Sequence, residues 1–201
     1  MPSQLLPRMR LSKMSWVSAF ACLLITTHVL PVQASTPSAD SESQKVLHVQ
    51  LHIEIPRLQV AEYHRPYVAI WLADERGQAQ ANLGVWYDLQ LANREGEKWL
   101  KDLRQWWRRT GRTLNLPMDG VSGATRAPGK HQVSYQQFAA DGTDLQQLPA
   151  GNYTIFIEAA REVGGRELLA LPVQLPLTAP IHVQAQGESE LGHVYATLSM
   201  Q

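Results

Sequence analysis

The 201-residue chain contains a single cysteine, Cys22, and has no excess of either charge. One thiol cannot build a disulfide framework, a Cys-rich zinc site or an iron–sulfur cluster. Eighteen Lys and Arg residues balance eighteen Asp and Glu residues, so no general attraction to nucleic acid is expected. Fingerprints of phosphate-binding loops, nucleophile elbows and zinc proteases are also missing. These absences favour a neutral globular protein over a nucleic-acid binder, and nothing in the motifs indicates a stand-alone enzyme.

Long hydrophobic runs are limited to one stretch near the N-terminus, from Trp16 to Leu30. It follows three basic residues and is too short to span a membrane comfortably. Val32 and Ala34 then supply small residues at the −3 and −1 positions of a cleavage site. We predict that residues 1–34 are a secretory signal peptide cleaved after Ala34. The mature protein would then be periplasmic, without cysteine and without a transmembrane segment.

The mature chain is expected to begin with a flexible leader and to continue as one domain of short strands. Residues 35–45 are rich in Ser, Thr, Pro and acidic residues, which is typical of a flexible segment. Val46 to Ile55 then alternates apolar and polar residues, the pattern of a half-buried strand. Further strands are predicted at Tyr67–Leu72, Leu83–Leu89, Val133–Phe138, Tyr153–Ala159, Leu168–Leu175, Ile181–Ala185 and Val194–Leu198.

The segment from Glu95 to Thr110 breaks the strand pattern. Trp99, Leu103 and Trp106 recur at positions i, i+4 and i+7, which predicts one amphipathic helix with Trp99 and Trp106 facing the core. Trp107 lies off this stripe and is expected to be more exposed. Many short strands with Gly- and Pro-rich turns and one helical insertion at about 95–110 indicate an all-β fold, an antiparallel β-sandwich spanning residues 46–201.

The predicted helix also has a basic face. A solvated surface is one interpretation of it. Docking to an acidic electron-transfer partner is the other, and such docking should weaken as salt is added. The residues are Lys98, Lys101, Arg104, Arg108 and Arg109.

Six segments of the mature chain resemble a family described as predicted periplasmic proteins, domain of unknown function 2271. That resemblance implies export and a β-rich fold more than any chemistry. Its Leu-Pro-Ala-Gly-x-Tyr segment is similar to the immunoglobulin-like domain of flagellar hook-cap proteins. The segments are Arg65–Trp71, Lys98–Leu103, Trp106-Trp107, Asp119–Arg126, Leu148–Thr154 and Glu158–Glu162.

A shorter motif, Asp119-Gly-Val-Ser-Gly-Ala-Thr125, resembles the flavinylation site of FMN-carrying subunits of electron-transport complexes. In those proteins an FAD:protein FMN transferase joins FMN through its phosphate to a threonine hydroxyl, and Thr125 matches that threonine. The small Gly123 would let the transferase and the phosphate approach the backbone. Ser122 could bond phosphate oxygens, and Asp119 could orient the loop. The matched subunits usually carry further Ser or Thr after the acceptor, whereas Arg126 follows here.

Two functions therefore stay open. The first is a periplasmic electron carrier with FMN on Thr125, serving membrane reductase components, in which Trp107 would cover the flavin ring. The second is a binding or assembly module without cofactor, in which the glycine-rich loop is structural and a sheet edge or the helix face carries the interaction.

Metal or haem handling through histidines is a weaker third reading. His48 and His52 share one face of a predicted strand, but about 13 Å would separate them at roughly 3.3 Å per residue. A single ion cannot bridge that distance, so we expect two solvent-facing histidines.

Overall fold

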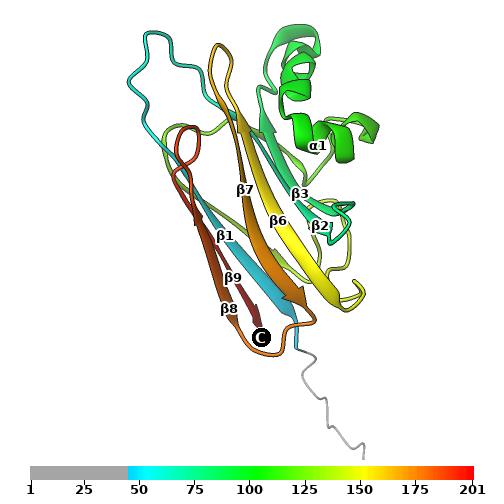
Figure 1. Cartoon of the computed structure of the whole chain (residues 1–201). Coiled ribbons are helices and arrows are strands. Elements are labelled where there is room, and N and C mark those ends of the chain that lie inside the picture. Colours follow the sequence, from blue (N-terminus) through cyan, green and yellow to red (C-terminus); the bar gives the residue numbers. More distant parts are fainter. Residues whose placement is uncertain (1–44) are drawn as a thin grey trace, which may run out of the picture. The chain divides into compact units, whose positions relative to one another are not determined.

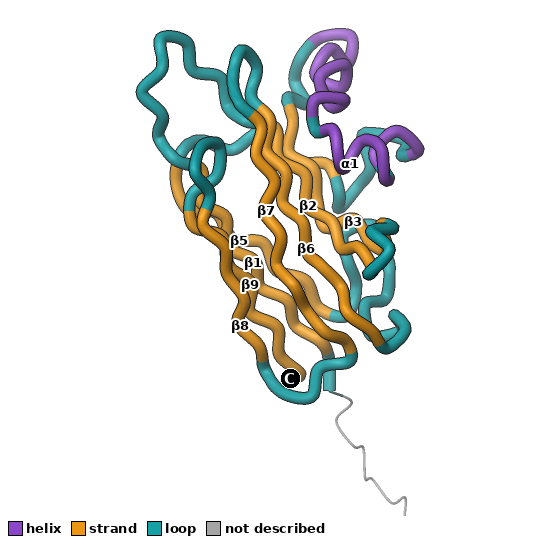
Figure 2. Tube along the Cα trace, viewed as in Figure 1, coloured by secondary structure: helices purple, strands orange, loops and turns teal. Residues whose placement is uncertain are grey.

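The computed structural model describes residues 45–201, and the predicted signal peptide and residues 35–44 of the predicted leader lie outside the described residues. Nine strands and three short helices make up this part of the chain (Figures 1 and 2). The strands are β1 Leu47–Ile55, β2 Tyr67–Asp74, β3 Ala79–Tyr87, β4 Ser122–Ala124, β5 Gly129–Gln136, β6 Gly151–Ala160, β7 Arg166–Leu175, β8 Ile181–Gln186 and β9 His193–Met200. The helices are η1 Ala92–Asp102, α1 Arg104–Arg109 and η2 Gly111–Thr113.

The strands form two sheets, which confirms the predicted β-sandwich. One sheet has the order β5-β1-β9-β8 and the other the order β4-β3-β2-β6-β7. All described pairings are antiparallel except that of β4 with β3, which is parallel. Every strand expected from the sequence is present, although several ends differ by a few residues. The structure also contains one strand that was not predicted, β4, which lies in a stretch without hydrophobic periodicity.

Two apolar layers explain the strand patterns. The first lies between the sheets and receives the inward side chains of β1, such as Leu51 and Ile53. The second lies on the other face of the β2–β3–β6 sheet and contains Trp71, Tyr87 and Trp106. Strand β2 contributes to both layers, so six of its eight residues are buried. This two-sided burial is the reason why β2 has an uninterrupted apolar sequence instead of an alternating one.

The helical segment differs from the predicted single helix. It is a 3₁₀ helix, η1, followed by one and a half turns of α-helix, α1, and the break falls at Leu103, whose ψ of 70° is not helical. The break changes the direction of the side chains that precede it. Trp106 is fully buried as predicted, but the prediction of a buried Trp99 was wrong, because this residue is 42% exposed. Trp107 is half-buried, with its ring centroid 6.3 Å from that of Trp106.

The start of α1 is held by a carboxylate from strand β6. Glu158 is fully buried, and its oxygens accept hydrogen bonds from the backbone N–H of Gln105 at 3.0 Å and of Trp106 at 2.9 Å. The Arg166 guanidinium donates to the same carboxylate at 3.1 Å. Glu158 therefore caps the N-terminus of α1 from a neighbouring strand, because it satisfies two backbone donors that the helix cannot satisfy itself.

A second polar contact joins α1 to strand β3. The buried Asn82 accepts a hydrogen bond from the Trp106 indole N–H at 3.0 Å and donates to the Thr110 hydroxyl at 3.1 Å. Asp141 accepts from the Asn82 backbone at 2.6 Å. These bonds fix α1 on the sheet in one orientation. Among residues 45–201, no helix is long and apolar enough to cross a membrane.

Replacing Glu158 by Gln should destabilise the fold by about 2 kcal/mol, because the amide keeps one acceptor but loses the charge that faces two N–H donors and a guanidinium. Urea unfolding monitored by tryptophan fluorescence measures this change. Glu75→Gln, an exposed carboxylate on the β2–β3 turn, should change stability by less than about 0.5 kcal/mol. Equal small changes in both variants would contradict the capping role.

Candidate functional site

The glycine-rich loop predicted to carry the modification site is held against the edge of strand β3. Gly120 has a φ of +75°, and a Cβ there would lie 2.6 Å from the carbonyl oxygen of Ala140. Only glycine fits this turn without strain. The Asp119 carboxylate accepts the Gly120 N–H at 3.0 Å, and its predicted role in orienting the loop during modification stays a prediction.

The next residues form strand β4. The Ser122 hydroxyl accepts a hydrogen bond from the Met118 N–H at 3.0 Å. Gly123 lies beside the ring of the buried Trp86, where a Cβ would come within 3.1 Å of the indole. Both residues thus have structural partners inside the loop and on β3, and neither lines the cavity described next.

Thr125 follows directly after β4, where the chain leaves the sheet. Its N–H donates to the Tyr87 carbonyl at 3.2 Å, which continues the parallel pairing by one residue. The side chain of the next residue, Arg126, turns over the Trp86 ring, with the guanidinium carbon 5.0 Å from the ring centroid. The backbone on both sides of Thr125 is therefore anchored, and its half-exposed side chain lines a cavity.

This cavity has a volume of about 460 Å³, within the range of roughly 300–1,000 Å³ typical of small-molecule sites. Its walls come from five separate parts of the chain. They are the end of the β1–β2 loop, the end of β3 with the residues after it, the helix η1, the end of β4, and the β6–β7 turn. The lining includes residues 63–65, 87–91 and 160–162, together with Tyr67, Trp99, Asp102, Ala124 and Thr125.

The rim of the cavity carries three exposed apolar side chains among its polar residues. Leu89, Leu91 and Trp99 are each at least 40% exposed, and all three line it. The wall also carries tyrosines whose hydroxyls lack partners. The hydroxyl oxygens of Tyr63 and Tyr87 are buried and have no partner at normal hydrogen-bond geometry, although Ser122 lies close enough to Tyr87 to oppose the rise in its pKa. Burial raises the pKa of both phenols above the ordinary value.

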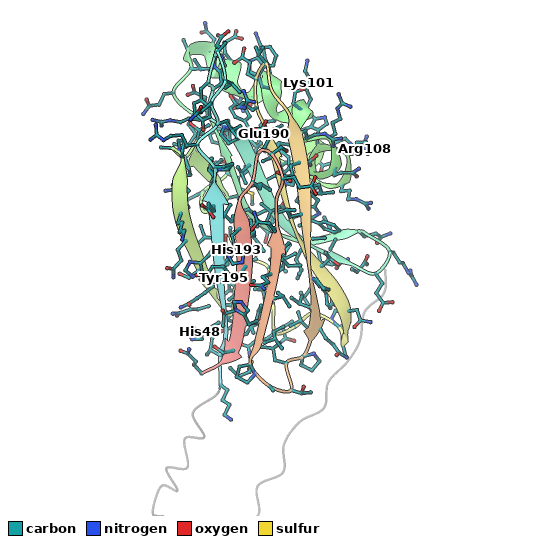
Figure 3. All side chains as sticks on the ribbon, turned by 60° about the vertical axis from the view of Figure 1, so that its left-hand side comes forward. His48, Lys101, Arg108, Glu190, His193 and Tyr195 are labelled. Carbon is teal, nitrogen blue, oxygen red and sulfur yellow. The ribbon has the colours of Figure 1, made fainter. Side chains whose placement is uncertain are left out.

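One wall is fixed by a buried ion pair. Arg161 lines the cavity, and its guanidinium bonds Glu190 at 2.9 and 3.1 Å. Glu190 is 2% exposed and accepts the Gly165 N–H as well. The pair ties the β6–β7 turn to the β8–β9 loop, and Figure 3 shows Glu190 near the top of the view. His64 approaches Glu62 at 2.9 Å and Glu162 at 3.7 Å on the neighbouring wall.

Of the five predicted site residues, Thr125 lines the cavity, while Asp119, Ser122 and Gly123 shape the loop that presents it. Trp107 is not among the lining residues and packs against the second apolar layer. The exposed aromatic ring at the cavity is that of Trp99. Sequence reasoning missed the wall residues Tyr63, Leu89 and Arg161, because only the fold brings their separate segments together.

The histidines lie mainly on the outer face of the other sheet. His52 stacks on Tyr195 with ring centroids 4.3 Å apart, and His182 and His193 flank the same tyrosine at 5.3 Å. Figure 3 shows His193, Tyr195 and His48 along this face. Within residues 45–201, no group of three or more His, Cys, Asp or Glu side chains is placed to hold a metal ion.

A protein-family model described as "Predicted periplasmic protein (DUF2271)" matches residues 48–193. The chain belongs to this family. Its family description places the protein in the periplasm, as the sequence predicted, and names no activity. No match was found among curated proteins or among solved structures. The family match thus supports a periplasmic location, and the structure supplies the fold.

The loop that holds Glu190 depends on a second carboxylate, Glu167. It accepts N–H bonds from Glu188 at 2.6 Å and Leu191 at 2.8 Å. Partial burial alone would raise the pKa of Glu167, but these donated bonds, with those from Ser189, lower it overall. A lowered folded-state pKa stabilises the fold above the unfolded value of about 4.3, and that stabilisation is lost as pH falls through the folded value.

Glu167→Gln should therefore lower the urea midpoint at pH 7, and the gap from the unmodified protein should close as the pH falls below about 4. Unfolding curves at several pH values measure both effects. The control Glu188→Gln removes an exposed carboxylate of the same loop and should leave the midpoint unchanged. A gap that stays constant down to acid pH would contradict the ionic character of the interaction.

Proposed function

We propose that this protein is a periplasmic electron carrier that holds FMN covalently on Thr125. The observation that carries the proposal is the position of Thr125. The one hydroxyl that matches the acceptor of a flavinylation motif lines a cavity large enough for a small molecule. The surrounding loop is fixed by Gly120 and by the pairing of β4 with β3, so the hydroxyl is presented in a defined place.

The residues of the cavity fit such a group. Trp99 offers an exposed aromatic face beside the cavity, as flavin rings favour. Arg65 is an exposed cation on the wall suited to a phosphate.

The reaction that would attach FMN to Thr125 needs no reagent other than FAD and the transferase. The Thr125 oxygen attacks the phosphorus of FAD that belongs to its FMN half. A phosphate ester bond to threonine forms, the pyrophosphate bond breaks, AMP leaves, and the hydroxyl proton passes to the transferase or to solvent. FAD and the transferase supply the chemistry, while this chain supplies the acceptor. Once bound, FMN provides reversible electron transfer, and the protein sets its exposure and surroundings. In this role the protein is a redox carrier rather than a stand-alone catalyst.

Co-expression with an FAD:protein FMN transferase in a periplasm should add the mass of one FMN less one water, on the peptide containing Thr125. Thr125→Ala should abolish the addition, and Thr125→Ser should retain it, because serine keeps the hydroxyl. Thr197→Ala, on the outer face of the other sheet, is the matched control and should be modified normally. An unmodified protein, with a known acceptor flavinylated in the same cells, would refute the proposal.

The identity of the covering aromatic ring is separately testable. Trp99→Leu should raise flavin fluorescence severalfold in the loaded protein, because tryptophan stacked on a flavin quenches its emission. Trp107→Leu should leave the fluorescence unchanged, since Trp107 packs in the second apolar layer. The reverse result would restore Trp107 as the covering residue.

A cofactor-free binding or assembly module is the second candidate. The exposed apolar rim of Leu89, Leu91 and Trp99 favours it independently of Thr125, because such patches commonly mark interaction sites. It becomes the leading function if no transferase modifies the chain.

A further inference from the structure

The charge of this nearly neutral protein is distributed unevenly. Residues 94–112 contain seven of its eighteen Lys and Arg residues but only three acidic ones. This segment comprises most of η1, all of α1 and most of η2, which cover one outer face of the β2–β3–β6 sheet (Figure 2). This helical segment therefore concentrates positive charge on one side of the described domain, and its first helix, η1, also forms a wall of the cavity.

Several of these cations have no carboxylate partner. Arg94 and Lys98 are paired with neighbouring glutamates at 2.6 Å. Lys101, Arg104 and Arg108 are exposed and make no ion pair within residues 45–201. Figure 3 shows Lys101 and Arg108 at the helical end, away from His48. An exposed cation without a partner in its own chain is free to pair with an acidic surface and to steer its approach.

Exposed apolar side chains lie next to these cations. Leu89, Leu91 and Trp99 surround the cavity. Val163, which is 78% exposed, lines an adjoining hollow together with Trp99 and Arg104. Asp88, Asp102 and Glu162 also line these hollows, so the cations of the helical segment flank a centre of mixed apolar and acidic character. Apolar residues bordered by charged ones are the ordinary composition of a protein–protein interface. We call the following residues the docking surface: Leu89, Leu91, Trp99, Lys101, Arg104, Arg108 and Val163.

The shape of this surface favours a protein over a lipid bilayer. The apolar residues ring a hollow of about 460 Å³ instead of projecting together from a convex loop or an amphipathic helix face. A flat membrane would contact the rim alone and gain little apolar burial. A protein with a convex acidic face could fill the rim and pair with the cations.

We propose that the docking surface binds an acidic redox protein and thereby brings that partner to the cavity beside Thr125. The redox meaning of this contact rests on the proposed flavin, whereas the binding itself does not. Charge complementarity would speed encounter and orient the partner, and the apolar rim would exclude water from the contact.

The test uses an acidic plant-type [2Fe–2S] ferredoxin as the probe and the full mature chain with Thr125→Ala, which cannot carry flavin. Titration followed by amide NMR should shift the signals of Leu89, Leu91 and the Trp99 indole, and binding should weaken as salt rises. Lys101→Glu combined with Arg104→Glu should weaken binding about tenfold or more. The matched control Lys45→Glu with Lys130→Glu changes the net charge equally at exposed sites elsewhere and should weaken it far less.

A second variant guards against a misfolded double mutant. Trp99→Leu keeps every cation and should also weaken binding, since the apolar centre is reduced. In flavin-loaded protein, the charge reversal should slow reduction by ferredoxin but not by dithionite. Shifts confined to other faces, unchanged affinity in both variants, or binding to anionic phosphatidylglycerol vesicles without binding to ferredoxin would overturn the proposal. A chain that binds ferredoxin yet accepts no flavin would refute only the proposed function.

Discussion

The buried Glu158 carboxylate is the contact on which the arrangement of the site depends. It joins strand β6 to the first turn of α1 by accepting hydrogen bonds from the backbone N–H groups of Gln105 and Trp106. Because a buried carboxylate is costly unless it is fully bonded, α1 has one favourable position on the sheet. That position determines where η1 lies, and with it the wall of the cavity that carries Trp99.

The opposite wall has a different origin. Strand β3 is buried on both faces and ends at Tyr87, where β4 pairs beside it in parallel and delivers Thr125. The site thus lies between a sheet edge, fixed by backbone pairing, and a helical segment, fixed by a side-chain cap. Loops contribute the remaining wall, held by the Arg161–Glu190 pair. A cavity built in this way is positioned by rigid elements and bordered by loops.

The sequence predicted the strands well because alternation and turn residues are local signals. It failed where a distant residue decides the structure. The spacing of Trp99 and Trp106 fits a continuous helix, but the cap that starts α1 comes from Glu158, more than fifty residues away along the chain. Nothing near Arg104 marks that start, so the exposure of Trp99 was not foreseeable. Thr125 was found through its motif, whereas the cavity could not be, since its walls come from five segments.

A tether at Thr125 would explain why the proposed site is an open hollow and not a deep pocket. Electron exchange with a large partner requires the redox group to lie near the surface, and an exposed seat binds a free ligand weakly. An exported protein would lose such a ligand to its surroundings. A covalent bond makes the second contact intramolecular, so that modest interactions with Trp99 and the other cavity walls act at a high effective concentration. Under this proposal the bond retains the group, and the cavity has only to orient it.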